Sequence, residues 1–286
     1  MMRYMVTGAS GGFGGYALDW LRRLAPEDDI VGLIRDPRKA AKVESKGFEV
    51  RIGDYGDIDS LMSAFGGVDR LLFISGAPGN RRSEHAHVVE AAKRRGVSFI
   101  AYTSLAQADL VHNMLSTDHV FTEAKILQSG IPHTFLRNNW YLENEALLFR
   151  HALKTGRLIY MSDEATVGWA LKREYAEAAA RVLISGNEPE VMELSADPTR
   201  YGELAQALEA ATGKAIEAVD LDEEQFVEAL RDDASEQTVQ GMVEVQRLIA
   251  HGDLEVESDD FTLALGHSLL GLEDAVKEVL SKQHLL

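Results

Sequence analysis

The sequence has no cysteine, and its acidic side chains far outnumber its basic ones. The lack of cysteine excludes disulfide bonds, thiolate catalysis and cysteine-type zinc sites. There are 29 lysines and arginines against 46 aspartates and glutamates, which gives a formal net charge of −17. Such a charge repels nucleic acid and anionic membrane surfaces over most of the molecule. Any phosphate-bearing ligand therefore needs a locally positive site.

Long hydrophobic runs are also missing. No apolar stretch approaches the length of a membrane span. The chain opens with the strand-like run Arg3-Tyr4-Met5-Val6 instead of the charged region and apolar core of a signal peptide. We therefore expect a cytoplasmic protein with no membrane insertion. Its 286 residues, 45% of them hydrophobic, can bury a large core in one big domain or in two unequal ones.

Short apolar runs alternate with amphipathic stretches through the first half of the chain. The predicted strands are Tyr4–Thr7, Ile30–Ile34, Glu49–Ile52, Arg70–Ile74, Ser98–Thr103 and His133–Leu136. The predicted helices between them are Gly12–Leu24, Pro37–Lys46, Ile58–Phe65, Ser83–Arg95 and Thr117–Ser129. This alternation, with strands that are apolar on both sides, predicts an α/β fold with a parallel sheet covered by helices on both faces.

Helices dominate beyond about Tyr160, with only short strands near Val191–Leu194 and Ile216–Val219. The helical patterns there are Arg173–Ser185, Tyr201–Ala211, Glu223–Leu230 and Gln237–Ala250. We predict a sheet domain over residues 1–155 together with parts of 165–195. Roughly residues 156–286 form a smaller, mostly helical lobe that is interleaved with the first domain and lies on its substrate side.

A glycine-rich turn joins the first predicted strand to the first predicted helix. Gly8, Gly11 and Gly14 have the spacing G-x-x-G-x-x-G. In such a turn the first glycine permits a tight bend, the second lets the backbone approach a pyrophosphate, and the third lets helix and strand pack closely. The start of the helix supplies amide donors and a positive dipole to the pyrophosphate. This strand–turn–helix context predicts a Rossmann-type dinucleotide-binding domain.

The residues that end the second strand indicate which dinucleotide is bound. An NAD-preferring dehydrogenase usually has an acidic residue there, which accepts a hydrogen bond from the ribose 2′-hydroxyl. This chain has Arg35 at that position, and Arg38 and Lys39 add positive charge. A guanidinium suits a 2′-phosphate, so NADPH is predicted, with NADH as an alternative. Arg35 as a solvated loop residue, with Asp36 as a helix cap, is the competing interpretation.

The glycine spacing resembles that of the short-chain dehydrogenases, whose ordinary members use a Tyr-x-x-x-Lys pair and a serine. Ser104 ends the fifth strand, but no tyrosine is followed four residues later by lysine. His119 and Glu123 occupy the two places on the following helix. Reduction of an isolated ketone creates an alkoxide whose conjugate acid has a pKa of roughly 15–16, so a proton donor matters. A quinone gives a phenolate-like oxygen with a pKa of about 10, which fits this chain better.

The whole chain resembles the NmrA-like atypical short-chain dehydrogenases, and within them the bacterial NAD(P)H:quinone oxidoreductases of type 2, with triphenylmethane reductase as a near relative. Its most distinctive segment is Leu136–Asn144. The other matching stretches are Thr7–Gly14, Val31–Pro37, Gly53–Tyr55, Leu72–Gly76, Phe99–Leu105, His119–Glu123 and Arg173–Val182.

The resemblance implies roles for particular residues. The turn around the pyrophosphate comprises Gly8, Ala9, Ser10, Gly11, Gly12 and Phe13, and Arg35 holds the 2′-phosphate. The nicotinamide side is lined by Ser75, Gly76 and Ala77. The cofactor site and pocket floor are completed by Asn138, Asn139, Trp140, Tyr141, Leu142 and Glu143. Trp140, Tyr141 and Asn144 are expected at the substrate pocket.

The catalytic group is left open by the sequence. His119 is a weak candidate for a proton donor, because histidine titrates near neutral pH, although a structural role competes. His85 and His87 are two apart on a predicted helix and point to different faces, so they predict no metal site. We expect NADPH as the cofactor, without flavin or metal.

The sequence therefore predicts an NADPH-dependent oxidoreductase that passes hydride directly to a quinone or similar conjugated acceptor. A non-catalytic NADP(H)-sensing regulator is one alternative, and a reductase of other aromatic acceptors such as triphenylmethane dyes is another. The expected partner is a small aromatic molecule, with no nucleic acid, and the protein is a monomer or a homodimer.

Overall fold

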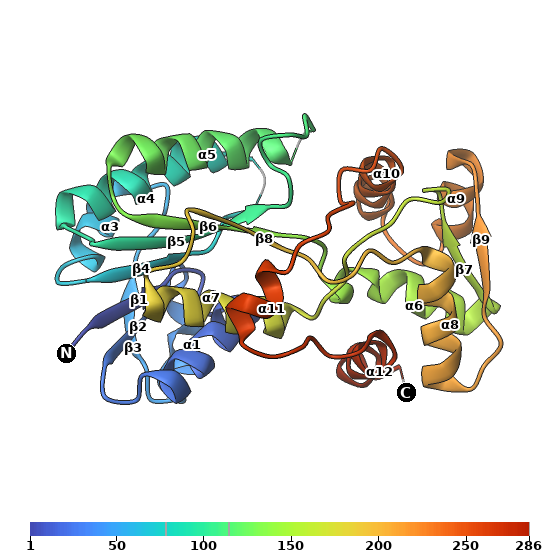
Figure 1. The fold of residues 1–286 in the computed structure, drawn as a ribbon, viewed down its shortest axis with the longest axis horizontal. Coiled ribbons are helices and arrows are strands. Elements are labelled where there is room, and N and C mark those ends of the chain that lie inside the picture. Colours follow the sequence, from blue (N-terminus) through green and yellow to red (C-terminus); the bar gives the residue numbers. More distant parts are fainter. Residues whose placement is uncertain (78, 114, 286) are drawn as a thin grey trace. The chain divides into compact units, whose positions relative to one another are not determined.

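Seven parallel strands form the central sheet in the described part of the chain, in the order β3-β2-β1-β4-β5-β6-β8 (Figure 1). The structure is a computed structural model that describes residues 1–77, 79–113 and 115–285. The strands are β1 (Arg3–Val6), β2 (Asp29–Ile34), β3 (Glu49–Ile52), β4 (Arg70–Phe73), β5 (Phe99–Leu105), β6 (His133–Asn138) and β8 (Val191–Leu194). Their register is parallel throughout, with Met5 opposite Val31 on one side and opposite Leu71 on the other.

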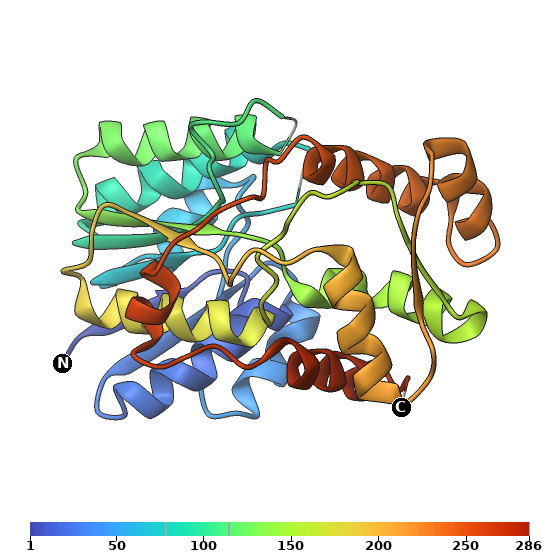
Figure 2. The same cartoon turned by 45° about the vertical axis from the view of Figure 1, so that its right-hand side comes forward.

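Helices cover both faces of this sheet. One face is covered by α3 (Ile58–Ala64), α4 (Arg81–Arg95) and α5 (Ser116–Ser129). The other face is covered by α1 (Gly12–Leu24) and α7 (Lys172–Ser185), with α11 (Asp260–Leu265) packed on α7. Figure 2 again shows α1 and α7 side by side. Every residue of β5 is buried, as expected for a strand between two helical layers.

The strand order reverses beside β1, which has β2 on one side and β4 on the other. The chain therefore leaves the carboxyl ends of β1 and β4 in opposite directions along the sheet. In open parallel sheets, ligands bind in the crevice that this divergence creates. The same place holds the glycine-rich turn between β1 and α1.

The chain divides into two units by its internal contacts. The first unit contains the central sheet and comprises Met1–Asn138, Lys172–Leu194 and Asp260–His267. The second comprises Asn139–Leu171, Ser195–Asp259 and the residues from Ser268 onward. Its elements are the 3-10 helix η2 (Leu142–Glu145), α6 (Ala146–Thr155), β7 (Arg157–Tyr160), α8 (Tyr201–Thr212), β9 (Glu217–Asp220), α9 (Glu223–Leu230), α10 (Glu236–Ala250) and α12 (Leu272–Lys282). In this unit β7 pairs with β9 in parallel.

The Rossmann-type α/β fold predicted from the sequence is confirmed, including all six strands of the first half. The prediction of one helix over Pro37–Lys46 is wrong in detail. A 3-10 turn η1 (Pro37–Lys39) precedes a short helix α2 (Ala40–Glu44), because the Asp36 carboxylate caps the turn by accepting from the amide of Arg38. The sequence reading also missed α6, β7, α11 and α12. In the described residues, no helix is both long and apolar enough to cross a membrane.

Candidate functional site at the carboxyl edge of the first unit

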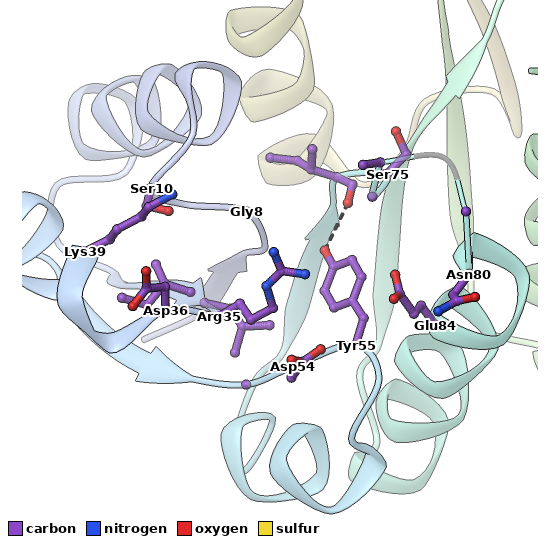
Figure 3. A pocket seen from close by; sticks show the side chains of 17 residues that line it. Gly8, Ser10, Arg35, Asp36, Lys39, Asp54, Tyr55, Ser75, Asn80 and Glu84 are labelled. Carbon is purple, nitrogen blue, oxygen red and sulfur yellow. Dashed lines mark hydrogen bonds between the residues drawn. The ribbon is translucent and has the colours of Figure 1, made fainter. Parts of the chain in front are cut away.

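A cavity of about 560 Å³ opens at the carboxyl ends of β1 to β4 (Figure 3). The turns that follow these four strands supply its walls. Figure 3 shows Arg35 reaching into the cavity on the side of Asp36 and Lys39, while Asn80 and Glu84 lie at its other end. Polar side chains therefore gather at the carboxyl ends of β1 and β4, where the strand order reverses.

The glycine turn after β1 is held in a conformation that other residues rarely adopt. Gly8 has φ +59°, in the left-handed region, and its carbonyl oxygen accepts from the amide of Gly11 at 2.9 Å. A methyl group added at Gly14 would lie 2.4 Å from the Gly8 oxygen and 2.8 Å from Cα of Ala9. Helix α1 can therefore approach the turn only because position 14 has no side chain.

The beginning of α1 is suited to an anion. Its N-cap is Gly11, which offers no side-chain acceptor, and its first turn contains no acidic residue. Lys42 donates from Nζ to the carbonyl oxygen of Ser10 at 3.3 Å, which places a positive charge beside the turn. The exposed helix dipole and this ammonium both favour a phosphate group.

The end of β2 has an unpaired positive charge. Asp36 forms an ion pair with Arg38 at 2.9 Å, and hydrogen bonds from Arg38 lower the pKa of this carboxyl. Arg35 is exposed, and neither it nor Lys39 forms a salt bridge with any residue that the structure describes. Arg38 thus neutralises the acidic neighbour and leaves Arg35 and Lys39 facing the cavity.

The opposite wall is fixed by side chains of the turn after β3 and of α4. Tyr55 donates from its hydroxyl to the carbonyl oxygen of Ile74 at 2.9 Å, and its own carbonyl oxygen contacts Nδ1 of His87 at 2.9 Å. Burial raises the pKa of the Tyr55 hydroxyl. The tyrosine is therefore a neutral donor that ties the end of β3 to the end of β4.

His85 anchors the turn that follows β4. Its Nε2 accepts from the amide of Gly76 at 3.0 Å, so the ring proton of the neutral form sits on Nδ1, which contacts the Thr122 hydroxyl at 2.8 Å. Burial, with a smaller effect from Arg81, lowers the pKa of His85 to about 3. The ring is consequently neutral and holds Gly76 in place.

His119 lies in the interior of the first unit. Arg81 contacts its Nε2 at 3.3 Å, so the proton of the neutral ring is on Nδ1, which contacts the Tyr102 hydroxyl at 2.9 Å. Burial, with a smaller effect from Arg81, lowers the pKa of His119 to about 3. An imidazole that stays neutral at neutral pH holds no imidazolium proton to donate, and we assign no proton transfer to it.

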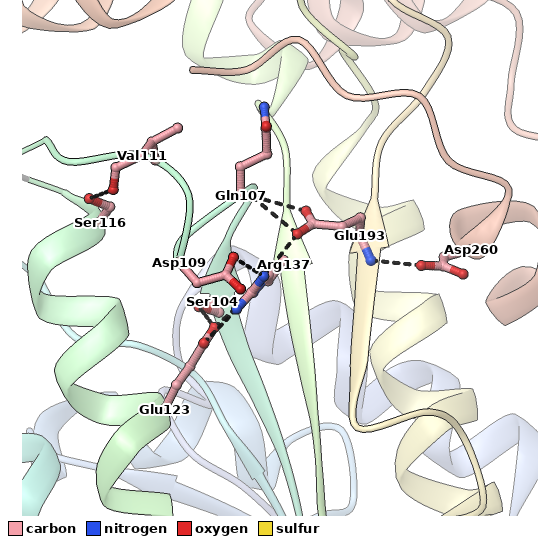
Figure 4. A network of polar contacts seen from close by, with 9 residues as sticks. All are labelled: Ser104, Gln107, Asp109, Val111, Ser116, Glu123, Arg137, Glu193 and Asp260. Carbon is pink, nitrogen blue, oxygen red and sulfur yellow. Dashed lines mark hydrogen bonds and ion pairs between the residues drawn. The ribbon is translucent and has the colours of Figure 1, made fainter. Parts of the chain in front are cut away.

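Glu123 stands at the second α5 position, where ordinary short-chain dehydrogenases have a residue of their catalytic pair. Its side chain is also engaged in buried contacts (Figure 4). Its carboxylate accepts from the Ser104 hydroxyl at 2.6 Å and from Nε and Nη2 of Arg137 at 3.1 and 2.8 Å. Arg137 also contacts Asp109 and Glu193. Ser104 and Glu123 are thus parts of a buried ion-pair network that joins β5, α5, β6 and β8.

The predicted residues of the glycine turn divide between two hollows. Gly8 and Ser10 line the main cavity, as do Arg35, Ser75, Gly76 and Ala77. Ala9, Gly11 and Gly12 line a neighbouring hollow of about 220 Å³, which also includes Lys42. The side chain of Phe13 is buried, with 7% of its surface exposed.

The predicted residues beyond β6 belong to the second unit, apart from Asn138, which ends β6. Asn139 is buried and its side-chain amide donates to Ser195 Oγ at 3.0 Å and to the carbonyl oxygen of Leu254 at 2.9 Å. Tyr141 forms an isolated parallel β-bridge with Ala170 through the backbone, and Leu142 is fully buried. Glu143 lies in η2. Trp140 and Asn144 line a separate hollow of about 340 Å³ within this unit.

Several polar residues that line the main cavity were given no role from the sequence, among them Asp54, Tyr55, Asn80 and Glu84. The signal for Asp54 and Tyr55 was their position just after a predicted strand, at the edge where ligands bind. Asn80 and Glu84 come from the start of α4, which no local motif marks. Across the described ranges, no group of three or more His, Asp or Glu side chains could hold a metal ion.

Comparison with known proteins gives consistent results. Residues 8–162 match a family described as NAD(P)H-binding. Quinone oxidoreductase 2 from Escherichia coli (strain K12) is 40% identical over 79% of this chain and 80% of its own length. The structure of Escherichia coli NADPH-dependent quinone oxidoreductase complexed with NADPH has a TM-score of 0.90 at 34% identity, covering 97% of this chain and 99% of that one. Citrobacter sp. triphenylmethane reductase complexed with NADP(H) has a TM-score of 0.91 at 32% identity, covering 98% and 100%.

Proposed function

Since the chain belongs to the NmrA-like family of NAD(P)H-binding proteins, we propose that it is an NADPH-dependent oxidoreductase whose acceptor is a quinone or a similar conjugated molecule. The relatives support this proposal through what their names state, namely quinone oxidoreductase, azoreductase and triphenylmethane reductase. All of these acceptors are conjugated and electrophilic.

The observation that carries the choice of NADPH is the state of Arg35. It stands where β2 ends, faces the cavity and has no salt-bridge partner in the described residues, whereas Asp36 is already paired with Arg38. An acidic side chain that is occupied in this way is a poor acceptor for a ribose 2′-hydroxyl, while a free guanidinium can bind a 2′-phosphate through two hydrogen bonds. We assign the 2′-phosphate to Arg35, with Lys39 adding positive charge.

The remaining contacts follow from the turns around the cavity. We assign the pyrophosphate to the turn from Gly8 to Phe13, where the start of α1 and Lys42 supply positive potential. We assign the nicotinamide side to the backbone of Ser75, Gly76 and Ala77, which His85 and Tyr55 hold in place. The roles inferred for Asn138–Glu143 stay predictions.

Bound NADPH supplies a hydride to the acceptor, and reduction of a quinone then takes one proton from solvent to complete the hydroquinone. The chain offers binding and orientation for this step. The side chains at positions 104, 119 and 123 are engaged in buried hydrogen bonds, so none is assigned as a proton donor. Such a donor is less needed for a phenolate-like product than for an alkoxide.

The test follows the absorbance of reduced nicotinamide with purified protein and 1,4-benzoquinone, with NADH in parallel. We expect NADPH oxidation above the rate without enzyme, and its loss in Gly11→Asp, because a carboxylate there would repel the pyrophosphate. No oxidation across a series of quinones, with NADP(H) binding intact, would contradict the proposal and leave an NADP(H)-sensing protein as the explanation. If NADPH were oxidised only with triphenylmethane dyes, these dyes would replace quinones as the proposed acceptor class.

A further inference from the structure

The turn that follows β4 is held through its backbone by side chains from other segments of the first unit. The amide of Ile74 donates to the Thr7 hydroxyl at 2.8 Å, and the carbonyl oxygen of Ile74 accepts from the Tyr55 hydroxyl at 2.9 Å. The amide of Ser75 donates to the hydroxyl of Thr103, on β5, at 2.8 Å. Side chains from three separate segments therefore fix this turn as far as the amide of Ser75.

Gly76 is held from α4 at both of its backbone polar groups. Its amide donates to Nε2 of His85 at 3.0 Å, and its carbonyl oxygen accepts from Nε of Arg81 at 2.9 Å. Arg81 and His85 are four residues apart on α4, so they lie on the same face of that helix. Both contacts therefore come from one side of the turn, and the N–H and C=O of Gly76 point in the same direction.

The two side chains that hold Gly76 are themselves buried and oriented. His85 is fully buried, and its ring packs edge-on against the rings of Phe73 and Tyr102, with centroid distances of 4.8 and 5.9 Å. Arg81 is 6% exposed, contacts Nε2 of His119 at 3.3 Å and forms no salt bridge with any residue that the structure describes. A buried guanidinium without a carboxylate partner is unfavourable for stability. Ion pairing therefore does not explain why an arginine stands here.

The planar trans peptide decides where the neighbouring groups point, since its C=O and N–H lie in opposite directions. The Gly76 amide is directed at His85, so the carbonyl oxygen of Ser75, in the same peptide, points away from α4. The Gly76 carbonyl is directed at Arg81, so the amide of Ala77 points away from α4 as well. Neither group is hydrogen-bonded within the described ranges, and Ser75 and Ala77 both line the main cavity (Figure 3). An acceptor and a donor are thus offered side by side to a ligand.

We propose that Arg81 and His85 are positioning residues, which orient these two backbone groups toward the carboxamide of the nicotinamide. A primary carboxamide carries an NH2 donor next to an acceptor oxygen, which matches the free carbonyl of Ser75 and the free amide of Ala77. All of these residues belong to the first unit. The identity of the ligand rests on the proposed function, because the dinucleotide brings the carboxamide.

The two side chains act through the peptide groups that they hold and do not line the cavity themselves. A carboxamide that is bound at both its donor and its acceptor has a fixed plane, and this restricts rotation of the ring that carries the hydride. A pair of ribose hydroxyls is the competing ligand group. Analogues that alter the carboxamide alone distinguish the two.

The test measures dissociation constants by titration calorimetry for NADPH and two reduced analogues, with no hydride acceptor present. In the 3-acetylpyridine analogue a methyl ketone replaces the carboxamide, which removes the NH2 donor and keeps the acceptor. In the thionicotinamide analogue sulfur replaces the oxygen, which keeps the donor and weakens the acceptor. We expect the wild type to bind each analogue about tenfold more weakly than NADPH, because each leaves one backbone group unsatisfied.

The two variants should lose different parts of this discrimination. His85→Leu releases the peptide that contains the Ser75 carbonyl, so NADPH should bind about tenfold more weakly and no better than the acetylpyridine analogue. The preference for NADPH over the thionicotinamide analogue should persist. Arg81→Met releases the peptide that contains the Ala77 amide and should show the reverse pattern. His85→Gln keeps an acceptor for the Gly76 amide and should restore the wild-type ratios.

The matched control is Arg95→Met. Arg95 also belongs to α4 and donates to a backbone carbonyl oxygen, that of Met62, but it does not line the main cavity. All three dissociation constants should be unchanged in this variant. Uniform weakening of all three dinucleotides in His85→Leu and Arg81→Met would indicate a merely structural role and overturn the proposal. Should one of these variants fail to fold, the other decides, because each has its own expected pattern.

The wild type alone also tests the assignment. Equal binding of the three dinucleotides would place another group, such as a ribose hydroxyl, at Ser75 and would overturn the proposal. Because these titrations contain no hydride acceptor, such a result is distinguishable from the absence of acceptor-dependent NADPH oxidation, which would contradict the proposed function instead.

Discussion

The Nε2 atom of His85, on α4, accepts a hydrogen bond from the amide of Gly76, which lies in the turn after β4. This contact joins a helix that covers the sheet to a backbone segment lining the main cavity. It exists only with the unprotonated Nε2, so it depends on a neutral ring. His119 is neutral for a related reason, with Arg81 directed at its Nε2.

Two buried neutral histidines make the stability of the first unit sensitive to acid. Each has a pKa of about 3 in the folded state, below the ordinary value of 6.5. The unfolded chain therefore binds protons below about pH 6.5 that the folded chain does not, and stability falls as the pH falls. Each histidine contributes a slope of about 1.4 kcal/mol per pH unit.

We predict that His119→Gln reduces this slope by about 1.4 kcal/mol per pH unit between roughly pH 6 and pH 4. Glutamine can replace the hydrogen bonds but does not titrate. The measurement is the free energy of unfolding in urea at several pH values, for the wild type and the variant. Parallel pH profiles for the two proteins would show that His119 is protonated in the folded state.

We predict that Arg35→Ala weakens NADPH binding by roughly 30-fold to 100-fold and leaves NADH binding unchanged, because only NADPH has a 2′-phosphate for a charged bidentate contact. Titration calorimetry with both dinucleotides measures this. Arg94→Ala is the matched control, since Arg94 is an exposed residue of α4 that pairs with Glu90 and does not line the main cavity. Equal losses for NADPH and NADH would argue against the 2′-phosphate assignment.

Two neighbouring glycines of α1 should respond in opposite ways to alanine. Gly14→Ala places a methyl group 2.4 Å from the Gly8 oxygen, and we expect destabilisation by at least about 2 kcal/mol together with loss of NADPH binding. At Gly15 the nearest atom to such a methyl is 4.0 Å away, so Gly15→Ala should stabilise by about 0.5–1 kcal/mol through helix propensity. Thermal unfolding with and without NADPH tests both variants.

The ion-pair network of Arg137 yields a prediction about stability. Arg137→Met leaves the Glu123 carboxylate buried without its partner, and we expect a loss of about 3–5 kcal/mol. The double variant Glu123→Leu with Arg137→Met removes both charges and should recover much of that loss. Asp109→Asn serves as the control because Asp109 is 56% exposed, and its effect should be below about 1 kcal/mol. Urea unfolding of the wild type, Arg137→Met, Glu123→Leu, the double variant and Asp109→Asn checks this, and additive losses in the double variant would rule out the coupling.

The sequence was informative wherever a local pattern has one physical cause. The spacing of Gly8, Gly11 and Gly14 predicted a strand, a tight turn and a helix, and the close approach at Gly14 explains why the third glycine is needed. The run after β2 predicted Arg35 as the residue that binds a 2′-phosphate, which stays a prediction, and the helix cap at Asp36, part of the competing interpretation, is present in the structure. In each case the signal and the structure lie within about ten residues of one another.

Features that depend on distant segments were not predictable in this way. Glu145 resembles any acidic residue of an amphipathic stretch, and only the fold brings Trp169 and Tyr201 to its oxygens. The pairing of β8 with β6 was not predictable either, because the sequence of a four-residue strand does not indicate which strand it pairs with. His119 was a weak candidate for a proton donor because its position in the sequence cannot show that Arg81 and Tyr102 enclose it.

The division of the chain into two units has a consequence for how the protein folds. The chain passes between the units five times, after Asn138, Leu171, Leu194, Asp259 and His267. Contacts such as β6 with β8 and α1 with α7 therefore close long loops, which raises contact order and slows folding. During synthesis, a nascent chain that ends before α7 leaves α1 without its packing partner and β6 with an open strand edge. Such an intermediate exposes apolar surface and depends on rapid completion of the chain, or on chaperones, to avoid aggregation.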